Sequence, residues 1–307
     1  MQKFLLFLAT LVMMLAAGCA RMPNTAVTSL KAETLTELQT YLLKSKAEVD
    51  EFRLRGPFAV TTHTDFQVIL PGGRITGDLF LSDAAGKAPL VIVLHGYDAS
   101  KEAHTFQAMH LASWGMHSLA LALPNRSRWV GNGKTLTEIV NAIQRRPEFI
   151  DPRVDASRII LVGHSFGGSS VGTALASGGR AAGGILLDPA AIGRELPNSL
   201  KKIGVPIMLI GADENISAAR NREYFYRFIP SGIAEFSIKD ATHEDGQYPS
   251  EREYEDEPVA TEEMQITFVS ALTAAALSIA ATGKLDYAWA SFRGAFESGK
   301  FFNAKRK

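Results

Sequence analysis

The chain has 307 residues, of which 46% are hydrophobic, so it can bury one large core, and we expect a single α/β domain. Its 32 Lys and Arg residues balance its 32 Asp and Glu residues, which argues against a nucleic-acid partner and against strong steering of a charged ligand. Cys19 is the single cysteine, so the chain by itself cannot form a disulfide bond.

Residues 1–18 have the pattern of an export signal. Lys3 gives a basic start, and the apolar run Phe4–Ala17 is too short to span a membrane. The small residues before Cys19 resemble a bacterial lipobox, although Ala16 stands where Leu is usual. We therefore expect lipidation of Cys19 and a membrane-anchored lipoprotein of the bacterial periplasm, with the outer membrane favoured. A plain signal peptide that is cleaved near this point is the alternative.

Residues 19–57 are predicted to form a short tether and an N-terminal helix. Residues 20–28 are small and polar, and Gly56-Pro57 ends the segment. Between them, apolar residues recur among charges at near-helical spacing: Leu30, Leu35, Leu38, Leu42, Val49 and Phe52. Residues 58–307 are then the expected α/β domain.

Strand and helix patterns alternate through residues 58–307. A hairpin is predicted over residues 58–81, and further strands are predicted at residues 90–94, 117–123, 159–162, 182–188, 205–211 and 234–238. Helical patterns separate most of these strands. The alternation predicts a doubly wound, mostly parallel sheet with helices on both faces, and ligands of such sheets bind at the carboxyl ends of the strands.

Three further segments complete the prediction along the chain. Pro124–Gly133 has no strand or helix period and is predicted to be a loop that precedes a helix over residues 136–145; its Trp129 either contacts substrate or packs the loop onto the body. The apolar helix predicted over residues 262–281 is too short in its apolar part for a membrane span, which favours a core helix. A second apolar stripe over residues 285–296 predicts a helix that covers the sheet, with contact to a membrane surface as the alternative.

The strongest chemical signal is a Gly-x-Ser-x-Gly motif that follows a buried strand. Ile159–Val162 lead into Gly163, Ser165 and Gly167, and small residues suited to a helix come next. A sharp strand-to-helix turn holds a serine in strained backbone and leaves no room for side chains two positions away on either side. We therefore predict that Ser165 is a nucleophile and that the N–H of Phe166 faces a developing oxyanion. A glycine-rich turn without catalysis is the alternative.

A serine nucleophile needs a base and a carboxylate that orients the base. His243 is the only histidine after Ser165, and it lies in a polar loop after a predicted strand. Asp188 ends one strand just before Pro189, whereas Asp213 and Glu214 end the next strand. The residues themselves leave the acid open between these two strand ends.

These motifs together resemble the platelet-activating-factor acetylhydrolase and chlorophyllase-like branch of the α/β-hydrolase superfamily. The resemblance covers about residues 85–245 and rests on His95-Gly96, Gly163–Gly168, Leu187–Pro189 and His243. It implies the α/β-hydrolase fold. It also implies Ser165 as nucleophile, His243 as base, Asp188 as orienting acid, and the backbone N–H groups of Tyr97 and Phe166 as oxyanion donors.

We accordingly expect an exported serine hydrolase that cleaves carboxylic esters of small molecules or lipids through an acyl-enzyme. The sequence has no metal-ligand cluster and no phosphate-binding loop, so no cofactor is expected. A peptidase or an acyltransferase with the same triad is the nearest alternative. The alternative from another class is a non-catalytic binding lipoprotein of the cell envelope on a hydrolase fold.

Overall fold

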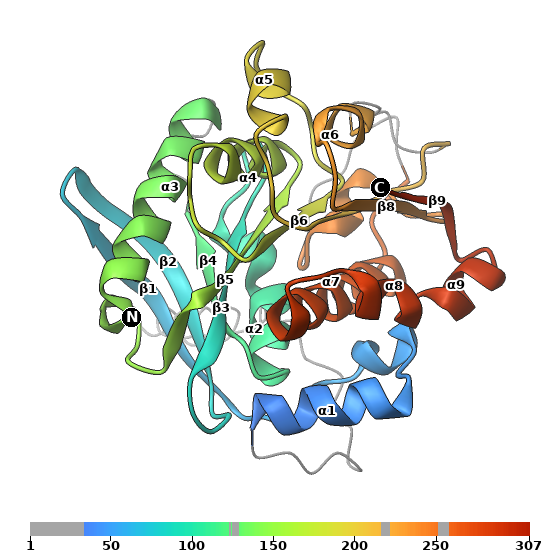
Figure 1. Cartoon of the computed structure of the whole chain (residues 1–307), viewed down its shortest axis with the longest axis horizontal. Helices are drawn as coiled ribbons and strands as arrows, with labels where there is room; N and C mark the ends of the chain where they lie inside the picture. Colours follow the sequence, from blue (N-terminus) through green and yellow to red (C-terminus); the bar gives the residue numbers. More distant parts are fainter. Residues whose placement is uncertain (1–33, 123, 125–128, 216–221, 251–257) are drawn as a thin grey trace, which may run out of the picture.

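The computed structural model of the chain describes residues 34–122, 124, 129–215, 222–250 and 258–307 (Figure 1). The predicted signal segment, the tether and Cys19 lie outside these residues. The described residues form a nine-stranded sheet in the order β1-β2-β4-β3-β5-β6-β7-β8-β9. The strands are β1 (Val60–Leu70), β2 (Gly73–Ser82), β3 (Ala88–Leu94), β4 (His117–Leu121), β5 (Val154–His164), β6 (Gly183–Leu187), β7 (Ile207–Gly211), β8 (Ile233–Ile238) and β9 (Phe301–Arg306).

The central strands are parallel, as the alternation of strands and helices predicts. β4, β3, β5, β6, β7 and β8 pair in parallel, whereas β1, β2 and β9 add antiparallel partners at the two ends of the sheet. The chain therefore has the predicted doubly wound α/β fold. The carboxyl ends of β3, β5, β6, β7 and β8 meet at one edge of the sheet, where ligands of such folds bind.

Helices cover both faces of the sheet (Figure 1). One face packs against α1 (Leu35–Ser45), α2 (Thr105–Ser113), α7 (Glu262–Thr282), α8 (Asp286–Ser291) and α9 (Arg293–Glu297). The other packs against α3 (Trp129–Arg145), α4 (Phe166–Ala176), α5 (Leu196–Leu200) and α6 (Glu223–Phe228). Because side chains alternate along a strand, Val91 of β3 enters the first core and its neighbour Ile92 enters the second.

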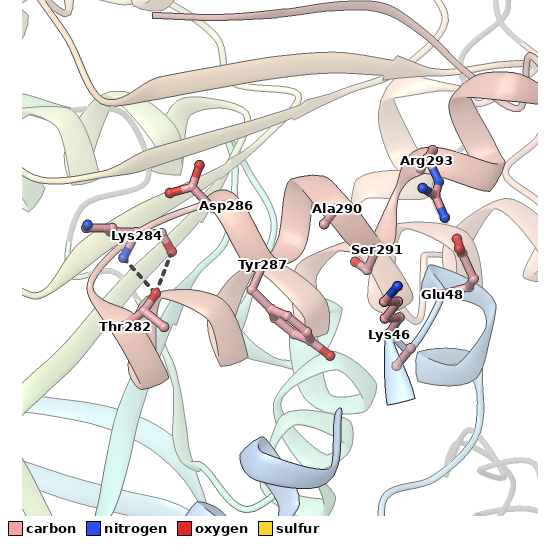
Figure 2. A pocket seen from close by; sticks show the side chains of 10 residues that line it. Lys46, Glu48, Thr282, Lys284, Asp286, Tyr287, Ala290, Ser291 and Arg293 are labelled. Carbon is pink, nitrogen blue, oxygen red and sulfur yellow. Dashed lines mark hydrogen bonds between the residues drawn. The ribbon is translucent and has the colours of Figure 1, made fainter. Parts of the chain in front are cut away.

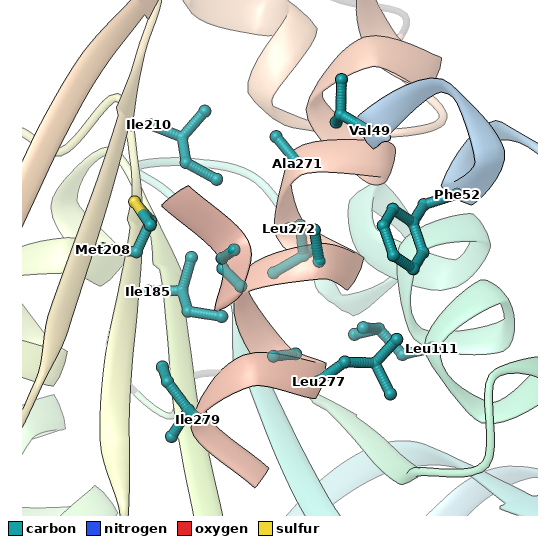
Figure 3. Close-up of a cluster of buried hydrophobic side chains, with 14 of the residues drawn as sticks. Val49, Phe52, Leu111, Ile185, Met208, Ile210, Ala271, Leu272, Leu277 and Ile279 are labelled. Atoms are coloured by element: carbon teal, nitrogen blue, oxygen red, sulfur yellow. The ribbon is translucent and has the colours of Figure 1, made fainter. Parts of the chain in front are cut away.

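Helix α7 fills the centre of the first core. Figure 3 shows it between strand side chains such as Ile185 and Met208 on one side and Phe52 and Leu111 on the other. Within the described part of the chain, α7 alone is long and apolar enough to cross a membrane, but 83% of its apolar window is buried inside the protein. The packing therefore agrees with the prediction of a core helix.

The structure corrects the predicted start of one helix. α3 begins at Trp129, so residues 129–133, which we predicted as loop, are helical. Gly133 had signalled a loop, but it is a packing site: a Cβ at this position would lie 2.6 Å from Cβ of Thr173 in α4. The glycine lets two helices approach closely, and this gain outweighs its low helix propensity.

The C-terminal region also differs from the prediction. The single helix expected over residues 285–296 is two short helices, α8 and α9. The strand that follows them, β9, was not predicted, and it pairs antiparallel with β8. Of its six residues only Phe301 is buried, so β9 lacks the alternating apolar pattern by which a half-buried strand is recognised.

Candidate active site

Ser165 stands on a strained turn between β5 and α4. Its φ of 52° and ψ of −121° are rare for a residue with a side chain. A Cβ at Gly163 would lie 2.4 Å from the carbonyl oxygen of Gly167, and a Cβ at Gly167 would lie 2.7 Å from that of Leu94. The two glycines of the motif are therefore required by close backbone contacts, as the steric argument predicts.

His243 begins a short 3₁₀ helix, η4 (His243–Gly246), a few residues after β8. The preceding residue, Thr242, and Asp245 cap each other's backbone N–H groups and fix this turn. The Nε2–H group of His164 donates to the backbone carbonyl of His243 at 2.9 Å, and the centres of the two imidazole rings lie 4.6 Å apart. The position of His243 is thus fixed by the turn itself and by the residue before Ser165.

Asp188 follows β6 and is buried, with 1% of its surface exposed. Its Oδ2 lies 2.5 Å from Nδ1 of His243, and its Oδ1 accepts the N–H of Ala212 at 3.0 Å. The guanidinium of Arg222 also contacts Oδ1, with Nη1 at 3.2 Å. Burial raises the pKa of Asp188, but the hydrogen bond and charge of His243 and the charge of Arg222 outweigh it, so its pKa lies below the usual value. Asp188 is therefore a buried, ionised partner for the histidine.

Asp213 and Glu214, the other candidate acids, make contacts of a different kind. Oδ2 of Asp213 accepts the N–H of Asp240 at 2.9 Å, and its Oδ1 accepts the N–H of Asn215 at 2.9 Å. Glu214 pairs with Arg222. The first carboxylate therefore holds the loops after β7 and β8 together, and the second partly neutralises a buried arginine.

Ser165 and His243 share one small cavity. It has a volume of about 30 Å³ and is lined by Gly96, Tyr97, His164, Ser165, His243, Glu244 and Gln247. The structure thus brings together the predicted nucleophile and base at the carboxyl ends of β5 and β8.

The two predicted oxyanion donors come from the ends of neighbouring strands. Tyr97 follows β3, and the turn before it is held by His95, whose Nδ1–H group donates to the carbonyl of Gly96 at 2.8 Å. Gly96 lies against the serine, since a Cβ added to it would be 2.9 Å from Cβ of Ser165. The rings of Tyr97 and Phe166 contact each other, with centroids 5.7 Å apart. The segments that carry both residues therefore adjoin Ser165.

The sequence analysis did not identify His164 or Arg222 as residues of this site. His164 had been assigned only to the variable position of the Gly-x-Ser-x-Gly turn, yet it lines the cavity and bonds to the backbone of His243. Arg222 carried no signal at all, because neither its spacing nor its neighbours mark a charged residue as buried. A search for polar residues at strand ends could have found the first but not the second.

A larger cavity of about 650 Å³ lies where the end of α1 meets α8 and α9 (Figure 2). Its charged lining is mixed: Lys46, Lys284 and Arg293 are basic, and Glu48 and Asp286 are acidic. Its lining contains no histidine or cysteine that could act as a base or nucleophile. The smaller cavity at Ser165 is therefore the better candidate for an active site.

A parallel sheet in this strand order, with a strained serine after β5 and a histidine after β8, defines the α/β-hydrolase class. In agreement, the protein-family model described as "Alpha/beta hydrolase family" matches residues 91–296, about two thirds of the chain. The chain therefore belongs to the α/β hydrolase family. A comparison with curated proteins found no match.

Proposed function

We propose that the protein is a serine esterase that hydrolyses carboxylic esters through an acyl-enzyme. The observation that carries this proposal is the 2.5 Å contact between Oδ2 of Asp188 and Nδ1 of His243, made by a histidine that shares a cavity with Ser165. A histidine oriented by a buried carboxylate beside a strained serine is the arrangement that activates a hydroxyl group.

The site residues have defined roles in the proposed reaction. Asp188 accepts the Nδ1–H of His243, so Nε2 is the nitrogen that takes the proton of Ser165 as Oγ forms a bond to the ester carbonyl carbon. The N–H groups of Tyr97 and Phe166 donate to the oxyanion. The C–O bond to the alcohol then breaks, and the alcohol leaves with the proton from His243. Water, deprotonated by the same histidine, attacks the acyl-enzyme and releases the acid and Ser165.

The position of the acid supports the finer family assignment. Asp188 follows β6, the strand that comes directly after the helix of the nucleophile, and not β7. That is the position implied by the resemblance to the platelet-activating-factor acetylhydrolase and chlorophyllase-like branch. We therefore propose an ester substrate, either a small molecule or a lipid, and no cofactor.

We also propose that the esterase is exported and anchored by lipid at Cys19, facing the bacterial periplasm. The proposal rests on the basic start, the short apolar run and the small residues before the single cysteine. Three acyl chains at one terminus would give stable anchoring, which a single chain does not.

Labelling with a fluorophosphonate, followed by assays on chromogenic esters of rising acyl length, tests the catalytic proposal. Ser165→Ala should lose labelling and lower kcat by roughly 10⁶-fold, as removal of the nucleophile does in triad enzymes. Ser177→Ala is the matched control, since Ser177 adjoins the same helix and its hydroxyl donates to the backbone carbonyl of Thr173. Residual activity of Ser165→Ala within about tenfold of the wild type would exclude the proposed nucleophile.

The same panel separates the alternatives. Amides cleaved as efficiently as esters would indicate a peptidase, and acyl transfer to an added alcohol in preference to water would indicate an acyltransferase. A folded wild-type protein that neither takes up the label nor hydrolyses any ester would favour the binding lipoprotein.

A further inference from the structure

Arg222 is buried behind the proposed acid and contacts it directly. The arginine immediately precedes α6, and only 4% of its side chain is exposed. Its Nη1 lies 3.2 Å from Oδ1 of Asp188 and donates to the carbonyl of Ala212 at 2.7 Å. The N–H of Ala212 donates to the same Oδ1 at 3.0 Å. Arg222 and Ala212 together hold the carboxylate oxygen that His243 does not use.

The guanidinium is itself fixed from its other sides. Nη2 donates to Oγ of Ser237 in β8 at 2.6 Å and to Glu214 after β7. Nε lies 3.6 Å from Glu235 in β8, which also pairs with Lys305 in β9. The charged groups around Arg222 are thus three carboxylates and one further cation, contributed by the ends or bodies of β6, β7, β8 and β9.

The neighbouring strand leaves space for this group. A Cβ at Gly211, the last residue of β7, would lie 1.5 Å from Nη1 of Arg222. The guanidinium therefore occupies the position that a side chain at the end of β7 would need. It lies next to Ala212, whose N–H donates to Asp188.

A buried arginine is a costly way to provide packing alone, because a charge removed from water must be paired and hydrogen-bonded on every side. What arginine offers here is a rigid fork with several donors, which a lysine lacks. Nη1 of Arg222 contacts Asp188, and Nη2 donates to Ser237 in β8. The guanidinium therefore restricts rotation of the Asp188 carboxylate and keeps Oδ2 directed at His243.

We propose that Arg222 is a positioning residue for the catalytic acid: its guanidinium fixes the rotamer of Asp188 and so holds Oδ2 of Asp188 against Nδ1 of His243. This inference rests on the proposed function, since it assigns Arg222 a task in the Ser165–His243–Asp188 reaction. The charge has a second consequence. A cation next to Asp188 opposes the positive charge that His243 acquires on protonation, so the base stays neutral, and active, at lower pH.

The pH profile of kcat/KM distinguishes this role from a structural one. Arg222→Gln removes the charge, which favours protonation of both His243 and Asp188. Both effects move the acid limb of the profile, where activity falls as the pH is lowered, to higher pH, by about one pH unit for the loss of one nearby charge. Arg222→Lys keeps a charge but loses the fork, so the acid limb should stay in place while kcat falls roughly 10- to 100-fold through misalignment. KM for a chromogenic acetate ester should change less than kcat in both variants.

Arg227→Gln is the matched control, because Arg227 is an exposed arginine of α6, the helix that Arg222 precedes. It should keep the kcat and the acid limb of the wild type. If Arg222→Gln does not fold, Arg222→Lys and Ser237→Ala decide the matter, since Ser237 anchors Arg222 on the side away from Asp188. A lower kcat with an unchanged KM in either soluble variant supports the role. Lower thermal stability with wild-type kcat and an unmoved acid limb in every folded variant overturns it.

Ser165→Ala, measured alongside, separates the two proposals. If it abolishes hydrolysis while the Arg222 variants behave as the wild type, only the positioning role fails. If Ser165→Ala itself retains hydrolysis, the proposed function fails.

Discussion

Oδ2 of Asp188 lies 2.5 Å from Nδ1 of His243, across 55 residues of chain. Asp188 follows β6 and His243 follows β8, and β7 lies between these strands in the sheet. The contact therefore spans the end of β7, where Asp213 instead holds two loops together. This geometry favours the earlier strand end as the source of the acid.

Asp188→Asn should lower kcat by roughly 10⁴-fold with little change in fold, because an amide keeps the shape but favours the wrong histidine tautomer. Asp213→Asn is the control from the neighbouring strand end, and it should reduce stability by about 1 kcal/mol and leave kcat near the wild-type value. Steady-state kinetics on one good ester substrate measures both variants.

The reverse result, with Asp188→Asn active and Asp213→Asn nearly inactive, would move the acid to the end of β7. The resemblance to the acetylhydrolase branch would then lose its most specific support, while the assignment of Ser165 would stand.

The second prediction concerns Cys19, which lies outside the described residues. If it is lipidated, the mature protein should partition with membranes, and Cys19→Ser should prevent that processing and leave the precursor uncleaved or soluble. Fractionation of cells, with mass spectrometry of the mature N-terminus, measures this. A wild-type protein that is soluble in the periplasm with an unmodified N-terminus would indicate a plain signal peptide.

The third prediction follows from three buried histidines. Burial lowers the pKa of His104, His110 and His117 from 6.5 to about 4. Between these values the unfolded chain binds protons that the folded chain does not, so stability is present above pH 6.5 and is lost as the pH falls towards 4. Each such histidine contributes up to about 1.4 kcal/mol per pH unit to this loss. Urea unfolding at several pH values measures the slope.

His117→Asn should make that slope shallower, since the amide oxygen can accept the N–H of Ser82 in place of Nδ1 without titrating. A slope equal to that of the wild type would contradict the assignment of acid sensitivity to the buried histidines.

The central strands could be predicted because a strand buried on both faces is a continuous apolar run, as in Ile159–Val162 and Ile207–Ile210. The turn at Ser165 could be predicted because a turn this sharp requires glycine at the two positions where a Cβ would clash with nearby backbone atoms. The start of α3 could not, since Gly133 has the same appearance in a loop as in a helix that touches another helix.

Within the candidate site, local sequence indicated which residue types could act, but not which of them meet. The choice between Asp188 and Asp213 depends on how three parallel strands end relative to one another, which their spacing along the chain leaves open. The burial of Arg222 could not be predicted from the sequence, because burial of a charge depends on the groups around it. Those groups, Asp188, Glu214, Ser237 and Glu235, come from three different strands or strand ends.

The last prediction tests the unpredicted strand β9. Phe301 is 1% exposed, and its ring stacks on that of Phe236 in β8 with centroids 4.5 Å apart. It also contacts Phe292 and Phe296, so Phe301→Ala would leave a cavity inside an aromatic cluster. We expect a loss of about 3–5 kcal/mol in the free energy of unfolding.

Phe302→Ala, one position along the same strand and only partly buried, should cost no more than about 1 kcal/mol. Urea unfolding of both variants measures the difference. Similar losses of stability in the two variants would mean that β9 does not cover the core beside β8. The expected difference would show that β9 stabilises β8, the strand in which Ser237 accepts a hydrogen bond from Arg222.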